Sequence, residues 1–191
     1  MNLNFRLILG SNSPRRRELL QEMGYEFESV SINCDESYPP DIPLANIALF
    51  LAEKKAAMYA RHLPENTVLI TADTTVRVGN QLLEKPHDKK EAVEMLQLIS
   101  GKKHLVTTGV CLTSKSNSYS FDDTTTVVFS KLSFEDIQFY IDNYKPFDKA
   151  GAYGIQEWIG MIGIKRLEGS YFNVVGLPTH KLFEALQNYS P

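Results

Sequence analysis

The stretch that most constrains the fold of this chain is residues 7–20. Residues 7–10 form a short apolar run that predicts a strand, and residues 11–13 form a small polar turn. Ser13 is a favourable N-cap, and the proline after it suits the first position of a helix. The free N–H groups of that first helical turn, together with Arg15 to Arg17, favour the binding of a phosphate. An ordinary capped helix with a solvent-exposed basic turn explains the same residues equally well.

Length, charge and cysteine content limit the class of protein. The chain has 191 residues, enough for one large domain or for two lobes that share a core. Its formal net charge of −3 argues against a nucleic-acid-binding surface. Cys34 and Cys111 lack the spacing of a zinc site or a disulfide framework, and no segment has the length and apolarity of a signal or membrane-spanning helix. We therefore expect a soluble cytoplasmic protein with no nucleic-acid or membrane partner.

The first half of the chain contains acidic and basic residues in unusual places. Asp35 and Glu36 follow a strand expected over residues 25–32 and lie in a proline-containing loop, for which simple solvation is the less specific explanation. Lys55 lies on the apolar face of a helix expected over residues 44–62. That face is formed by Leu44, Ile47, Ala48, Leu51 and Met58. Because an unpaired buried charge is costly, Lys55 must reach water, pair with an acid or meet an anionic ligand.

A second acidic position follows the apolar run that begins at Thr67. We expect a strand that ends at Asp73, and strand ends are where open α/β sheets bind ligands. The turn at residues 79–80 then predicts a hairpin whose exit carries Lys85. Further on, residues 148–156 contain closely spaced glycines, which indicate either a sharp turn or close approach of a ligand.

The remaining elements are expected to be structural. Strands are expected over residues 104–113 and 119–132, and helices after Asp88, Ser133 and residue 178. The predicted buried stripe of the helix after Ser133 is Phe134, Ile137, Tyr140, Ile141 and Tyr144. One α/β unit with two lobes over residues 1–191 accounts best for this pattern.

Together these features favour phosphate ester chemistry. Carboxylates can hold Mg²⁺ and orient water, while lysine and arginine neutralise the charge of a polyphosphate. The sequence contains no G-x-x-x-x-G-K-[ST] motif, which argues against a P-loop enzyme.

Motifs along the whole chain resemble those of the Maf family of nucleoside triphosphate pyrophosphatases. They are Ser11-Asn12-Ser13-Pro14-Arg15-Arg16, Ala72-Asp73-Thr74-Thr75-Val76, Glu84-Lys85-Pro86, Ser100-Gly101, Asp148 to Gln156, Gly169-Ser170-Tyr171 and Val175-Gly176-Leu177-Pro178. The resemblance implies an ITPase-like (Maf/Ham1) α/β fold, a mixed sheet with helices and two lobes flanking a central cleft. It also implies hydrolysis of a nucleoside triphosphate to the monophosphate and pyrophosphate, a divalent cation (Mg²⁺ or Mn²⁺), and commonly a homodimer.

The resemblance also implies residue roles. Asp73 corresponds to the acceptor of the water proton, and Glu36 to a residue that holds the metal, with Asp73 a further candidate metal ligand. Lys55 and Lys85 correspond to residues that bind phosphate or organise that centre. Ser11 and Arg16 correspond to phosphate-binding residues.

The resemblance also implies which nucleotides are substrates and which residues select them. The motifs resemble the branch that acts on dTTP and UTP, with Arg15, Thr74 and Gln156 as the specificity positions. Two departures stand out: Gly10 replaces alanine or serine, and Glu157-Trp158-Ile159 replaces a smaller, glycine-rich continuation. A non-catalytic nucleotide-binding regulator of cell division is the alternative function, although Asp73 and Glu36 favour an enzyme.

Overall fold

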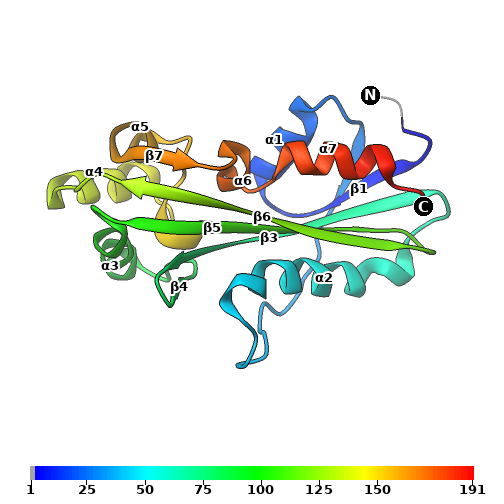
Figure 1. Cartoon of the computed structure of the whole chain (residues 1–191), viewed down its shortest axis with the longest axis horizontal. Helices are drawn as coiled ribbons and strands as arrows, with labels where there is room; N and C mark the ends of the chain where they lie inside the picture. The colour runs from blue at the N-terminus through cyan, green and yellow to red at the C-terminus, as the bar shows by residue number, and fades with distance from the viewer. Residues whose placement is uncertain (1–2) are drawn as a thin grey trace. The chain divides into compact units, whose positions relative to one another are not determined.

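The structure, a computed structural model, describes residues 3–191 as an α/β protein (Figure 1). Its strands are β1 (Arg6–Gly10), β2 (Phe27–Val30), β3 (Thr67–Val78), β4 (Gln81–Leu83), β5 (Lys103–Thr113), β6 (Ser118–Phe129) and β7 (Ile164–Glu168). Its α-helices are α1 (Pro14–Glu22), α2 (Ile47–Tyr59), α3 (Lys89–Ile99), α4 (Phe134–Tyr144), α5 (Trp158–Gly163), α6 (Tyr171–Val175) and α7 (Thr179–Asn188). Short 3₁₀ turns are η1 (Leu44–Asn46), η2 (Ala60–His62) and η3 (Ala150–Ala152). Within residues 3–191, the helices are all too short or too polar to cross a bilayer.

The strands form one mixed sheet in the order β2-β1-β3-β5-β6-β7, with β4 paired to β3. β1 runs parallel to both β2 and β3, whereas β4 is antiparallel to β3 and β7 is antiparallel to β6. This confirms the mixed α/β sheet expected from the sequence.

Two compact units are built from interleaved parts of the chain. Unit 1 contains Met1–Asp73, Thr108–Asp123 and Gly176–Pro191, and unit 2 contains Thr74–Thr107 and Thr124–Val175. The strands β3, β5 and β6 each contribute residues to both units.

In unit 1, α1 and α7 lie on one face of the sheet and α2 lies on the other (Figure 1). The side of α2 that faces the sheet carries small side chains. Ala52 and Ala56 are buried there, and Ala56 packs with Cys111 of β5. The hydroxyl of Thr71 on β3 donates a hydrogen bond to the carbonyl of Ala52, at 2.7 Å. The predicted apolar face of this helix was wrong at Met58, which is exposed. The turn of α2 that contacts the sheet is the one that carries the small alanines.

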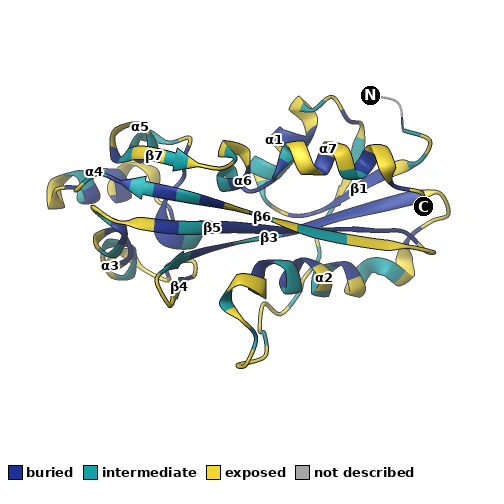
Figure 2. Cartoon of the chain, viewed as in Figure 1, coloured by how far each residue is buried: buried dark blue, intermediate teal, exposed yellow. Residues whose placement is uncertain are grey.

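Unit 2 has a core of its own, visible as buried segments in Figure 2. The helix α3 is capped by Asp88, whose side chain accepts the N–H of Glu91, and it buries Ala92, Met95, Leu96 and Ile99. The helix α4 begins with the capping box formed by Ser133 and Asp136. Its predicted stripe was wrong at its two ends: Phe134 and Tyr144 are exposed, and only the three central residues are buried.

A buried histidine lies in the unit 2 core. His104 is 1% exposed, its Nε2 is 2.7 Å from the hydroxyl of Tyr153, and its ring packs at 5.5 Å from that of Phe129. Its Nδ1 has no hydrogen-bond partner among the described residues. Burial lowers the pKa of His104 to about 4, so the folded protein keeps this ring neutral.

Acidification should therefore destabilise the protein through His104. His104 takes up a proton near pH 6.5 in the unfolded chain but only near pH 4 in the folded protein. The free energy of unfolding therefore decreases as the pH falls through that interval. Between about pH 7 and pH 5 the loss from this residue should be roughly 2 kcal/mol. Urea unfolding at both pH values measures it. In the His104→Gln variant, the loss of stability that His104 causes over this pH interval should disappear. If the variant loses as much stability as the wild type, His104 is not the group responsible.

Candidate active site

The predicted strand, turn and helix at the N-terminus are present. The strand β1 ends at Gly10, where a Cβ atom would lie 2.6 Å from Cδ1 of Ile32, so the small residue suits the packing. Ser13 caps α1 and its side chain accepts the N–H of Arg16 at 3.4 Å. The Ser11 hydroxyl accepts the N–H of Ser13 at 3.2 Å. The turn thus presents the N-terminus of a nine-residue helix, a geometry that favours anions.

Arg16 turns back over this segment. Its Nε donates to the carbonyl of Gly176 at 2.8 Å, and its Nη1 donates to the hydroxyl of Ser11 at 3.4 Å. Burial lowers the pKa of Arg16, while the negative charges of Asp73 and Glu36 oppose that effect. An arginine side chain still stays charged at neutral pH. The structure therefore brings Ser11 and Arg16 together and places Arg16 in the electric field of two predicted catalytic acids.

Three further predicted residues meet in unit 1. Lys55 comes from α2, Asp73 from β3 and Glu36 from the loop after β2. The Nζ of Lys55 lies 2.5 Å from Oδ1 of Asp73 and 2.9 Å from Oε1 of Glu36. The side chains of Lys55 and Asp73 are largely buried, at 12% and 13% exposure, whereas Glu36 is more open at 47%. Of the alternatives left open for Lys55, pairing with acids is the one observed.

The two carboxylates determine the protonation of Lys55. Burial disfavours the charged amine, but the charge of Asp73 and the hydrogen bonds to Asp73 and Glu36 outweigh it and raise the pKa of Lys55. The ammonium group is therefore a fixed positive charge that orients one oxygen of each acid.

A neighbouring contact holds the loop that carries Glu36. Oδ1 of Asp35 accepts the N–H of Ser37 at 3.0 Å, and Lys54 Nζ donates to the carbonyl of Ser37 at 2.7 Å. The hydrogen bonds from Ser37 lower the pKa of Asp35, which is exposed. Sequence reasoning missed this role for Lys54. The available signal was its position beside Lys55 on the same helix.

The expected position of Asp73 on its strand was wrong. The strand β3 does not end there but continues for five more residues to Val78. It changes partner instead: residues 67–70 pair with β1, and residues 76–78 pair with β4. Asp73 lies between the two pairings, so the carboxylate projects from inside a long strand and not from its end.

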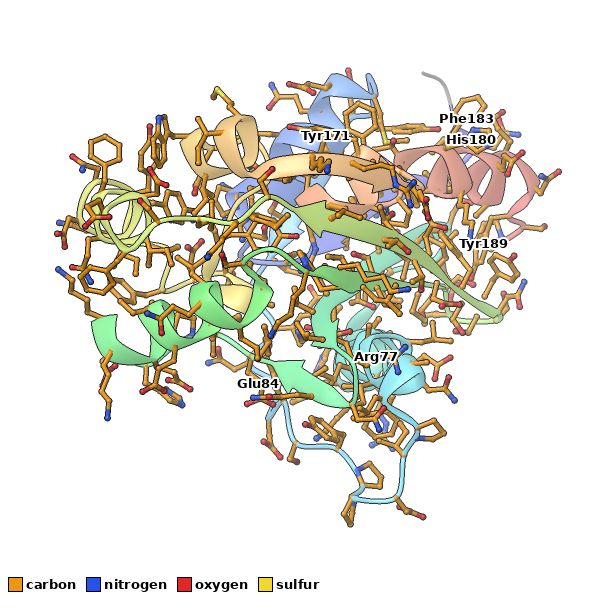
Figure 3. All side chains as sticks on the ribbon, turned by 60° about the vertical axis from the view of Figure 1, so that its left-hand side comes forward. Arg77, Glu84, Tyr171, His180, Phe183 and Tyr189 are labelled. Atoms are coloured by element: carbon orange, nitrogen blue, oxygen red, sulfur yellow. The ribbon has the colours of Figure 1, made fainter. Side chains whose placement is uncertain are left out.

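Three predicted residues belong to unit 2. Thr74 is half-buried on β3, and Lys85 is exposed just after β4. Gln156 is exposed between η3 and α5. The N–H of Gly151 donates to the carbonyl of Glu84 at 3.1 Å, which ties the glycine-rich segment to the residue directly after β4. Glu84 is labelled in Figure 3. Arg15 is half-buried on α1 in unit 1.

The predicted metal ligands can be tested against this geometry. Across residues 3–191, no group of three or more His, Cys, Asp or Glu side chains gathers in a way that could hold a metal ion. Mg²⁺, however, is commonly held by one or two carboxylates together with waters and substrate phosphates. Asp73 and Glu36 converge on one ammonium group and each has a second carboxylate oxygen, so this pair fits a cation that a triphosphate helps to bind.

Comparison with solved structures identifies the class of fold. The Ham1 protein of Staphylococcus aureus matches with a TM-score of 0.52 over 94% of this chain and 98% of that protein, at 13% sequence identity. The chain thus has the mixed α/β fold of Ham1-like proteins.

Sequence comparison is more specific. The model of Maf-like proteins matches residues 6–189. The chain is 46% identical to a dTTP/UTP pyrophosphatase of Phocaeicola vulgatus, over 96% of this chain and 95% of the relative. It is also 46% identical to a dTTP/UTP pyrophosphatase of Flavobacterium psychrophilum, over 98% of this chain and 96% of the relative. The chain belongs to the Maf family.

Proposed function

We propose that this protein is a nucleoside triphosphate pyrophosphatase that hydrolyses dTTP and UTP, and modified pyrimidine nucleotides of the same kind, to the monophosphate and pyrophosphate. The observation that carries the proposal is the largely buried Lys55 ammonium group held between Asp73 and Glu36. The full-length similarity to relatives named dTTP/UTP pyrophosphatase supports the choice of substrates.

In this proposal the chain adds water across the α–β phosphoanhydride bond. The water oxygen bonds to phosphorus as the bridging P–O bond breaks, and the proton of the water passes to Asp73. The hydrogen bond from Lys55 holds the Asp73 carboxylate in a fixed orientation. Ser11, Arg16 and the N-terminus of α1 bind phosphate oxygens, and Lys85 binds a further phosphate.

A divalent cation, Mg²⁺ or Mn²⁺, is part of the proposal. Glu36 and Asp73 would hold it through their carboxylate oxygens. When bound, such an ion neutralises phosphate charge and lowers the pKa of a water molecule. Asp73 therefore has two proposed roles, as metal ligand and as proton acceptor.

Arg15, Thr74 and Gln156 are the proposed specificity residues. The exposed amide of Gln156 offers both a donor and an acceptor, which suits the edge of a uracil or thymine base. A site that hydrogen-bonds positions 3 and 4 of uracil or thymine rejects cytosine, in which the donor and the acceptor at those two positions are exchanged.

We also propose that the two units are lobes of a single domain over residues 1–191, because three strands contribute to both.

The family resemblance supports a homodimer. The two free cysteines, Cys34 and Cys111, support a reducing, cytoplasmic compartment.

The test is pyrophosphate release from dTTP, UTP, CTP, ATP, GTP and 7-methyl-GTP, each with Mg²⁺ or Mn²⁺ and with neither. We expect selective turnover of dTTP and UTP that depends on the cation. Binding of a nucleotide without cleavage of any would overturn the proposal in favour of a non-catalytic nucleotide-binding regulator.

A further inference from the structure

The residue directly after Gln156 takes part in a partly buried charge network. Glu157 Oε1 lies 3.1 Å from the Nζ of Lys149, whose side chain is 9% exposed. Lys149 also pairs with Asp148 at 2.7 Å. Because Lys149 is this buried, loss of Glu157 would leave its charge paired with Asp148 alone, and this cost favours the observed position of Glu157.

A tyrosine completes the network from α4. The hydroxyl of Tyr140 donates to Oε2 of Glu157 and accepts the backbone N–H of Gly154 at 3.0 Å. Burial and the neighbouring carboxylate raise the pKa of Tyr140, so its hydroxyl stays neutral and remains a donor. One hydroxyl therefore joins the backbone before Gln156 to the side chain after it.

The backbone on both sides of Gln156 is also tightly packed. A Cβ atom on Gly154 would lie 2.7 Å from the Cδ of Glu157, and one on Gly160 would lie 1.9 Å from the carbonyl oxygen of Ile155. Ile155 and Ile159 are buried. Gln156 itself is exposed, so its side chain projects from a segment whose neighbours are fixed.

We infer that Glu157 is a positioning residue for nucleobase selection: through Lys149 and Tyr140 it fixes the backbone from which Gln156 reaches the base. The inference rests on the proposed function, because it assigns a cause to the preference for uracil and thymine. It also gives a role to the Glu157-Trp158-Ile159 departure from the family pattern. The carboxylate adds side-chain contacts with Lys149 and Tyr140 to this turn.

The experiment compares kcat and KM for UTP and CTP in wild type, Glu157→Gln and Tyr140→Phe. Glu157→Gln keeps an acceptor for Tyr140 but loses the charge that pairs with Lys149, and Tyr140→Phe loses only the hydroxyl. In both variants we expect KM for UTP to rise and the UTP/CTP ratio of kcat/KM to fall about tenfold. The double variant should lose little more than either single variant, because both act through one network.

Glu94→Gln is the matched control in unit 2. Glu94 forms an exposed pair with Lys90 at 3.8 Å on α3, and its loss should leave KM and the UTP/CTP ratio unchanged.

A purely structural role of Glu157 would reduce the amount of folded enzyme and hence kcat for both nucleotides equally, with KM and the UTP/CTP ratio preserved. That result in Glu157→Gln and Tyr140→Phe would overturn the inference. A wild-type protein without a preference for UTP would instead overturn the proposed function, and this inference with it.

Discussion

Replacement of Asp73 by asparagine is expected to lower the turnover of dTTP and UTP by at least about a hundredfold, the usual contribution of a general base. The amide cannot accept the proton of the water, and it removes one of the two negative charges that surround Lys55. The fold should survive, because the amide oxygen can still accept the hydrogen bond that Lys55 now donates over 2.5 Å. Initial rates of pyrophosphate release at saturating nucleotide measure the loss, and circular dichroism reports on the fold.

Glu65→Gln is the control for this variant. Glu65 also pairs with a lysine, Lys115, at 2.6 Å within unit 1, but its side chain is 82% exposed. The same change from carboxylate to amide should leave turnover near the wild-type value, since exposed pairs contribute little. Near-normal turnover in Asp73→Asn would remove the basis for its role as proton acceptor.

Replacement of Gly109 by alanine is expected to destabilise the protein by about 3 kcal/mol. Gly109 lies in the middle of β5, and a Cβ atom there would lie 2.4 Å from the Cα and N atoms of Leu49 on α2. Those are backbone atoms, so no rotamer change relieves the overlap, and α2 must move away from the sheet. Because Lys55 lies on the same helix, activity should fall as well. Thermal unfolding should show a midpoint lower by roughly 10 °C.

Gly79→Ala separates this steric effect from the general cost of replacing a glycine. Gly79 has a φ of +58°, and a Cβ atom there would contact nothing within 4 Å. Its replacement should cost only about 1 kcal/mol, from the left-handed backbone conformation. Equal losses in the two variants would mean that the close approach of β5 to α2 is not what requires glycine at position 109.

Local chemistry made parts of this structure predictable from the sequence. Ser13 and Pro14 mark the start of α1 because capping depends on adjacent residues only. The Ser133 and Asp136 capping box marks α4 for the same reason. Lys55 was identifiable because a lysine on an apolar helix face needs a partner, and the structure supplies two.

Tertiary features were less predictable. The turn at residues 79–80 predicts the hairpin with β4, but whether its first strand runs unbroken through Asp73 also depends on pairing with β1, a distant part of the chain. The exposure of Met58 follows from which turn of α2 packs on the sheet. The network of Glu157 joins α4 to a loop that follows it, and periodicity within either segment carries no signal for that contact.

The hydrogen bond between Arg16 and Gly176 joins residues that are 160 positions apart in the chain. During synthesis, the strand, turn and helix of residues 6–22 leave the ribosome before residues 108–123 and 176–191, which unit 1 also needs. Closure of so long a loop is slow and follows local structure formation. The guanidinium group proposed to receive the phosphates is therefore fixed in place only after Gly176 has been made, so a chain truncated or stalled before that residue carries this arginine without its anchoring carbonyl.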